Sequence, residues 1–215
     1  MALVKICGIR TLDEAKKAVS YGVDALGFHV GEVKGSRSIV SSDTAHEIIT
    51  KLPASIIPVL VTTSSKISDI EEIVKTIGAR AVQFHDDATT KEISRFKKEL
   101  PEIKAWKVIH VQDEMAIEDA KLFASVSDAI LLDSASHRQG QIGGTGKTHD
   151  WEISAKIVRS ISLPIILAGG LNPDNVADAI EKVHPYMVDV NSGVSRKNGT
   201  KDLDKVRAFI KRAKS

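Results

Sequence analysis

The sequence has little of several features that mark whole classes of protein. Its 215 residues contain a single cysteine, Cys7, so no disulfide forms within the chain and a reducing compartment is expected. Its 30 basic and 28 acidic side chains nearly balance, so overall charge favours neither nucleic acid nor an anionic membrane as partner. An anionic small molecule must therefore be captured by local groups.

Long apolar stretches are also missing. No apolar run approaches the roughly 20 residues that span a bilayer, and the first residues lack the basic region and apolar stretch of a signal peptide. We therefore expect a soluble, cytoplasmic protein without a membrane partner. With 42% apolar and 27% charged residues, the composition suits one globular domain over residues 1–215.

Eight short apolar runs alternate with longer amphipathic segments. Each run is rich in Val, Ile and Leu, which is typical of parallel strands covered on both faces. The runs lie at residues 3–7, 25–30, 56–61, 79–84, 105–109, 129–132, 164–168 and 187–190. Eight strand-helix units at this length predict an α/β fold, a (β/α)8 TIM barrel. The alternative, a doubly wound sheet, seldom holds eight parallel strands in so short a chain.

Capping signals support helices between the runs. Thr11–Glu14 and Thr89–Glu92 have the pattern of capping boxes, and Gly78 stands where an amphipathic helix would end. Asn172–Pro173 predicts a cap followed by a proline in the first helical turn. The polar, glycine-rich segment 134–148 is too long for a tight connection, and such a loop is usually functional when it follows a barrel strand.

Two reactive side chains stand at the ends of apolar runs, where a barrel places the groups that act on substrate. Cys7 ends the first run. Its thiol is either a general base, once deprotonated, or a small buried hydrophobe. Asp133 directly follows the sixth run, and a carboxylate there is costly unless it caps a helix, pairs with a charge or acts on a substrate. Position alone does not decide between a structural and a catalytic role for Asp133.

Glycines follow the last three runs. The segments are 143–146, Gly169–Gly170 and Ser192–Gly193. Each alone could be turn chemistry, but together they favour a phosphate held by backbone N–H groups. Arg37 follows the second run, where its guanidinium would either hold a carboxylate or remain solvated at the surface.

Three histidines, His29, His85 and His110, lie near the ends of the second, fourth and fifth runs. Such a cluster could ligate a metal ion. The spacing matches no compact metal motif, however, and neutral, hydrogen-bonded histidines are the commoner outcome. We therefore expect no metal ion.

In several segments, ordered from residue 4 to about residue 196, the sequence resembles the phosphoribosylanthranilate isomerase family. These are Val4-Lys5-Ile6-Cys7-Gly8-Ile9-Arg10, Val82-Gln83-Phe84-His85, Leu131-Leu132-Asp133, Gly143-Gly144-Thr145-Gly146 with Asp150-Trp151, Leu167 to Val176, and Val188 to Val194. The resemblance implies a (β/α)8 barrel in tryptophan biosynthesis. It also implies a cofactor-free Amadori rearrangement of N-(5-phosphoribosyl)anthranilate to 1-(o-carboxyphenylamino)-1-deoxyribulose 5-phosphate.

The resemblance also implies roles for individual residues. Cys7 would be the general base, Asp133 the general acid, and Arg37 would hold the anthranilate carboxylate. An acid acting near neutral pH needs a raised pKa and a thiol base a lowered one, so their environments should differ. The remaining substrate-binding residues would be Gly144, Gly169, Gly170, Asp189, Ser192 and Gly193, with backbone donors holding the phosphate. We expect a monomer or homodimer that binds a small phosphorylated substrate.

Departures from the family pattern fall in the first half of the chain. Gly35-Ser36-Arg37 replaces a Ser-Pro-Arg run, His29 stands where an apolar residue is usual, Thr62-Thr63 where an asparagine is favoured, and Asp86 where a glycine is typical. These departures affect the part of the predicted site that would hold the anthranilate ring. Two alternatives remain open: a related sugar-phosphate isomerase or epimerase on the same barrel, and a catalytically silent barrel that binds a phosphorylated metabolite.

Overall fold

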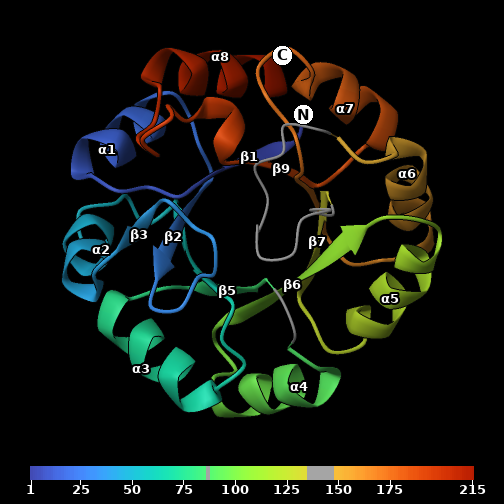
Figure 1. The fold of residues 1–215 in the computed structure, drawn as a ribbon, viewed down its shortest axis with the longest axis horizontal. Helices are drawn as coiled ribbons and strands as arrows, with labels where there is room; N and C mark the ends of the chain where they lie inside the picture. Colours follow the sequence, from blue (N-terminus) through green and yellow to red (C-terminus); the bar gives the residue numbers. More distant parts are fainter. Residues whose placement is uncertain (86–87, 135–147) are drawn as a thin grey trace.

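A computed structural model describes residues 1–85, 88–134 and 148–215 of the chain. Eight parallel strands close into a barrel, because β1 is hydrogen-bonded both to β2 and to β9. Figure 1 looks down this barrel and shows the helices as a ring around it. The barrel strands are β1 (Leu3–Cys7), β2 (Ala25–Val30), β4 (Ile57–Thr62), β5 (Ala81–Phe84), β6 (Lys104–Val111), β7 (Ala129–Ser134), β8 (Ile165–Leu167) and β9 (Met187–Val190).

One further strand lies outside the barrel wall. The two-residue β3 (Ile39–Val40) pairs in parallel with the end of β2. It was not expected from the sequence, because two residues are too few for a recognisable pattern. Its pairing ties the loop after β2 back onto the barrel.

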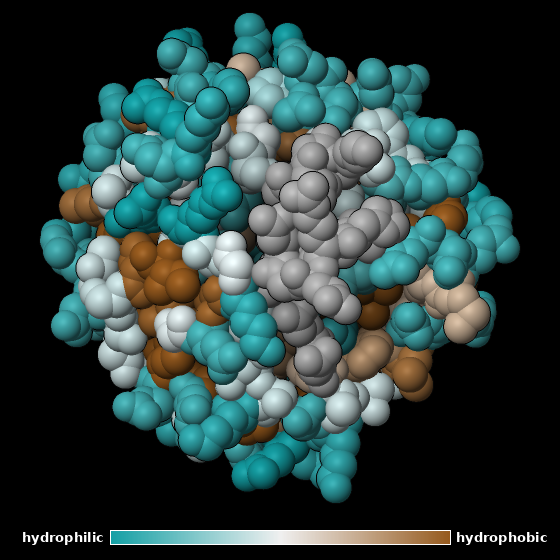
Figure 2. All heavy atoms as spheres, in the orientation of Figure 1, coloured by the Kyte–Doolittle hydropathy of each residue, from teal (hydrophilic) through white to brown (hydrophobic). Residues whose placement is uncertain are grey.

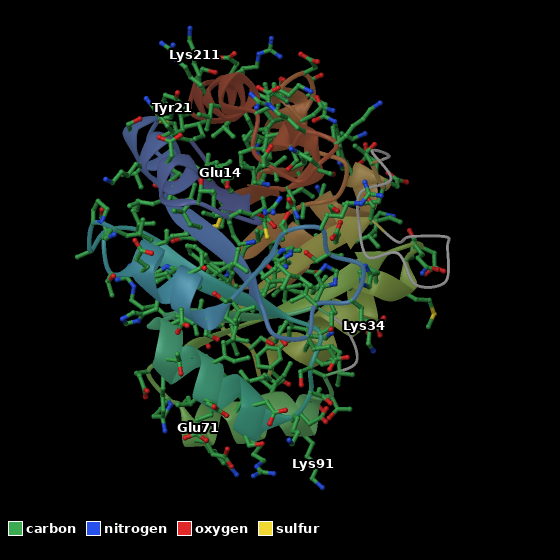
Figure 3. All side chains as sticks on the ribbon, turned by 60° about the vertical axis from the view of Figure 1, so that its left-hand side comes forward. Glu14, Tyr21, Lys34, Glu71, Lys91 and Lys211 are labelled. Atoms are coloured by element: carbon green, nitrogen blue, oxygen red, sulfur yellow. The ribbon has the colours of Figure 1, made fainter. Side chains whose placement is uncertain are left out.

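The helices of the described residues form the outer layer, and none of them is long and apolar enough to cross a membrane. Figure 3 shows Glu71 and Lys91 on the outside of this layer. The helices are α1 (Leu12–Ser20), α2 (Ser42–Ile49), α3 (Ile67–Ile77), α4 (Thr90–Glu99), α5 (Met115–Ala124), α6 (Trp151–Ser160), α7 (Val176–Val183) and α8 (Leu203–Ala213), with the short 3-10 helix η1 (Ser192–Val194) before α8. The predicted (β/α)8 barrel is confirmed.

The helix ends agree with the sequence in part. At α4, Thr89 and Glu92 form the full reciprocal capping box. At α1, Thr11 caps through its hydroxyl, but the Glu14 carboxylate accepts from the backbone N–H groups of other residues instead. The expected start of a helix at Asn172–Pro173 is wrong, because Asn172 Oδ1 accepts from Asp174 N and forms a turn ahead of α7.

The core has two apolar parts, one between strands and helices and one inside the barrel. Strand residues alternate between them, since successive side chains point to opposite faces. In β1, Val4 and Ile6 face the helices, whereas Lys5 and Cys7 face the barrel interior. The interior part consists of Ala25, Val59, Ala81, Trp106, Val108, Ala129, Leu131, Ile166, Ala168 and Met187. Toward the carboxyl ends of the strands several inward positions are polar, among them His29, Gln83 and Asp133.

Candidate active site

A cavity of about 380 Å³ lies at the carboxyl ends of the strands. Its walls come from the ends of six strands and from the segments after β2, β5, β8 and β9. Figure 2 shows that this face carries mostly hydrophilic side chains, with an apolar patch over β2 and β3. Among the residues predicted for the site, those that line the cavity are Cys7, Arg37, Asp133, Gly169, Gly170, Asp189 and Ser192.

Cys7 points into this cavity from the end of β1. Its side chain is buried and packs with Val33 and Val61. Gly27 on the neighbouring strand makes room for it, because a Cβ at Gly27 would lie 2.8 Å from Cys7 Sγ. Burial raises the pKa of the thiol, although the positive charge of Lys5 acts in the opposite direction. The expectation of a lowered pKa for Cys7 is therefore wrong for this structure.

His29 lies beside Cys7 rather than with the other histidines. Its Nε2 is 3.3 Å from Cys7 Sγ, and its Nδ1 is 2.5 Å from Ser36 Oγ. Burial, followed by the repulsion of Lys5 and Lys201, lowers the pKa of His29 to about 3. The ring is therefore neutral at physiological pH.

Asp133 reaches the cavity from β7. Its Oδ1 accepts from the backbone N–H of Ser134 at 2.7 Å, and its Oδ2 lies 3.7 Å from His85 Nε2. Burial raises the pKa of this carboxyl, against the opposing effects of His85 and His110. A raised pKa is what a general acid at neutral pH requires.

The three histidines do not come together as one group. The rings of His85 and His110 lie 5.5 Å apart between centroids, near Asp133, whereas His29 contacts Cys7 and Ser36. In residues 1–85, 88–134 and 148–215, no three His, Cys, Asp or Glu side chains are grouped so as to hold a metal ion.

Directly beneath Cys7 lies a buried ion pair that the sequence did not single out. Lys5 Nζ is 3.0 Å from Asp189 Oδ2 and donates to Gln83 Oε1 at 2.8 Å. Burial lowers the pKa of Lys5, but the attraction of Asp189 and Cys7 outweighs it and the net pKa is raised. Within the described part of the chain, the buried Oδ1 of Asp189 has no hydrogen-bond partner. That oxygen can accept from a ligand in the cavity.

The predicted phosphate segments meet at the side of the cavity formed by the loops after β8 and β9. Gly169 and Gly170 have φ angles of +77° and +67°, which few residues other than glycine adopt. Gly193 does not line the cavity as expected, but a Cβ there would lie 2.0 Å from the Leu171 carbonyl oxygen. It therefore allows the two loops to pack closely. Gly144 lies outside the described residues.

Arg37 is exposed at the cavity edge, on the loop after β2 that also carries Lys34 (Figure 3). Two threonines at the end of β4 hold this loop. Thr63 donates through both its N–H and its hydroxyl to the Glu32 carbonyl, and its hydroxyl accepts from Lys34 N. Thr62 also donates to the Glu32 carbonyl, at 3.4 Å. The threonines that replace the usual asparagine thus anchor the loop that carries Arg37.

A second buried lysine supports the loop after β9. Lys201 Nζ donates to Asn191 Oδ1 and to Ser195 Oγ, both at 2.8 Å. Its backbone N–H donates to the Glu14 carboxylate on α1. Burial lowers the pKa of Lys201 to about 8. No pattern in the sequence pointed to this residue, because its role depends on contacts between the first and last loops.

Comparison with known proteins identifies the family of this chain. The family described as N-(5'-phosphoribosyl)anthranilate (PRA) isomerase matches residues 4–212. The chain belongs to this family. An N-(5'-phosphoribosyl)anthranilate isomerase 2 of Methanosarcina mazei is 42% identical over 99% of this chain and 94% of its own length. The enzyme of Methanocella arvoryzae is 41% identical over 100% of this chain and 99% of its own.

Solved structures of the PRA isomerase family share the fold. The Thermotoga maritima phosphoribosyl anthranilate isomerase superposes with a TM-score of 0.88 at 33% identity, covering 100% of this chain and 99% of its own. A second family structure, at 31% identity, TM-score 0.85 and the same coverage, holds reduced 1-(o-carboxyphenylamino)-1-deoxyribulose 5-phosphate. As a PRA isomerase family member, this protein is an isomerase of tryptophan biosynthesis.

The family motifs contain some of the residues that sequence reasoning missed. Lys5 and Gln83 lie within motifs that carry the resemblance, yet neither was given a role. A polar residue inside an otherwise apolar run was the signal that could have found them. His29 was noted only as a departure from the PRA isomerase pattern, and its contact with Cys7 appears only in three dimensions.

Proposed function

We propose that this protein converts N-(5-phosphoribosyl)anthranilate to 1-(o-carboxyphenylamino)-1-deoxyribulose 5-phosphate, with Cys7 as general base and Asp133 as general acid. The observation that carries the proposal is that a thiol from β1 and a carboxyl from β7 line the same cavity. The bound ligand of the related structure, a reduced form of that product, supports the choice of substrate.

The reaction needs two proton transfers. Asp133 gives its proton to the furanose ring oxygen, and the bond from that oxygen to C1 breaks to leave an iminium ion. Cys7, as thiolate, then removes the proton from C2, and the electron pair of that bond neutralises the iminium as an enolamine. Proton transfer to C1 and loss of the O2 proton give the ketose, so atoms and charge balance without a cofactor.

Binding groups around the cavity position the substrate for these transfers. The exposed guanidinium of Arg37 at the cavity edge holds the anthranilate carboxylate through two parallel hydrogen bonds. The loops of Gly169, Gly170 and Ser192 hold the phosphate at the opposite end, with Gly193 allowing them to pack together. Asp189 accepts a hydrogen bond from a sugar hydroxyl through its buried Oδ1. Fixing both ends of the substrate holds C1 and C2 between base and acid.

The pKa of both Asp133 and Cys7 is raised, which suits an acid more directly than a base. Burial raises the pKa of the Asp133 carboxyl and so increases the fraction that is protonated at a given pH. The thiol pKa is raised as well, so the reactive thiolate is a minor form of the free enzyme at neutral pH. The iminium formed in the first step carries a positive charge beside Cys7 and favours the thiolate when it is needed.

Turnover measurements test the proposal. The wild type should convert phosphoribosylanthranilate, while Cys7→Ser and Asp133→Asn should each lower kcat by about 10²–10⁴-fold, as expected for loss of a general base or acid. Circular dichroism and the melting temperature should show that both variants remain folded. Wild-type rates in either variant would refute the assigned role. Failure of the folded wild type to turn over this substrate would favour a different sugar phosphate.

A further inference from the structure

We propose that His29 is a positioning residue for Cys7: the neutral imidazole donates its Nε2–H to the sulfur and stabilises the thiolate. The inference concerns the ionisation of Cys7, and it rests on the proposed function only in taking that thiolate to be the base. It gives a role to a histidine at a position where the family pattern has an apolar residue.

The contact is close and shielded from water. His29 Nε2 lies 3.3 Å from Cys7 Sγ, within hydrogen-bond distance for sulfur, and both side chains are at least 94% buried. Both residues face the barrel interior from the neighbouring strands β1 and β2. Gly27 leaves the space that lets the sulfur occupy this position. A hydrogen bond in such an environment is electrostatically stronger than in water.

Ser36 contacts the other ring nitrogen of His29, and we assign the ring proton to Nε2. Its Oγ accepts from the backbone N–H of Ser38 at 3.0 Å and lies 2.5 Å from His29 Nδ1. In the proposed arrangement the Ser36 hydroxyl donates its proton to Nδ1. A neutral ring that accepts at Nδ1 carries its proton on Nε2 and presents it to the sulfur.

The other charged groups near Cys7 divide into those that favour the thiolate and those that oppose it. Lys5 on β1 and Lys201 before α8 favour it, whereas Asp189 on β9 opposes it. Because Lys5 is already paired with Asp189, its charge is largely compensated. His29 itself stays uncharged, since its pKa is lowered to about 3. Its contribution is thus a directed N–H and not a further positive charge.

Alkylation of the thiol measures this effect directly. Cys7 is the only cysteine in the chain, so the pH dependence of its reaction with iodoacetamide reports one group. In His29→Val, which removes the donor, we expect the midpoint to rise by about one pH unit, a tenfold loss of thiolate at a given pH. His29→Gln, which keeps an N–H donor, should recover part of the shift. Ser36→Ala should raise the midpoint by less.

A matched control separates this role from general effects of losing a histidine. His46 is exposed on α2, away from the cavity, and His46→Val should leave the midpoint unchanged. An unchanged midpoint in folded His29→Val and Ser36→Ala would overturn the proposal. If the midpoint rises but the pH dependence of kcat/KM does not follow it, the contact acts on Cys7 as inferred and the base assignment fails instead.

Discussion

The barrel interior contains two groups of inward-facing side chains of opposite kind, an apolar half and a polar half, with β5 and β9 also contributing Ala81 and Met187 to the apolar half. On β6, β7 and β8 the inward positions include Val108, Leu131 and Ile166. On β1, β5 and β9 they include Lys5, Gln83 and Asp189, joined by an ion pair and a hydrogen bond. The apolar half gains free energy simply from burial. The polar half must desolvate two charges, so its benefit is better sought in the support it gives to Cys7 and the cavity.

The largest effect on stability should come from removing one charged partner of the Lys5–Asp189 ion pair. Asp189→Leu leaves the Lys5 ammonium buried without its partner, which should lower the free energy of unfolding by about 3–5 kcal/mol. Urea denaturation measures the loss. The double variant Lys5→Met with Asp189→Leu should recover most of it, because both charges are then absent. If the double variant is as unstable as the single one, the charge is not the cause.

A truncation in the apolar half should cost a similar or smaller amount. Leu131 is fully buried, and Leu131→Ala should lower the free energy of unfolding by about 2–5 kcal/mol because it opens a cavity. Leu122→Ala, at an α5 position that is 57% exposed, is the matched control and should change stability little. Equal losses in the two variants would contradict the assignment of Leu131 to a tightly packed interior.

A smaller effect on stability, but a specific one on binding, is expected at the cavity rim. Gly169 and Gly22 both have positive φ angles, so alanine at either site should cost about 1 kcal/mol of backbone strain. Only at Gly169 would the new Cβ also clash, at 2.4 Å from Ser134 N and 3.0 Å from Asp133 Oδ1, so Gly169→Ala should lose further stability as the neighbouring backbone shifts. Steady-state kinetics should therefore show KM raised about tenfold in Gly169→Ala and unchanged in Gly22→Ala. Equal KM values in the two variants would show that Gly169 is not part of the binding site.

The sequence predicted the barrel well because eight apolar runs and their spacing are local features. It could not separate the two halves of the interior, because strands covered on both faces show no alternation of apolar and polar residues. Lys5 therefore lay unremarked inside an apolar run. The short β3 and the turn that moves the start of α7 to Val176 depend on contacts that no local pattern encodes.

Most of the site residues that were predicted from their positions after apolar runs line one cavity. Cys7 and Asp133 lie at the carboxyl ends of strands, and these ends meet at one side of a barrel. Their pKa values were harder to anticipate, because burial dominates both and burial is a property of the folded chain. The same holds for Lys201, which reaches the loop after β9 only once the last segment packs against α1.

The pH dependence of kcat/KM tests the acid–base pair most directly. Catalysis needs Cys7 ionised and Asp133 protonated, so activity should rise until Asp133 ionises, above the ordinary pKa of 3.8. It should then stay level and fall only when Cys7 is fully ionised, above the ordinary pKa of 9.0. In Asp133→Asn the remaining activity should instead keep rising with pH until Cys7 ionises. A wild-type profile that falls well below pH 9, or an Asp133→Asn profile of the wild-type shape, would contradict the account.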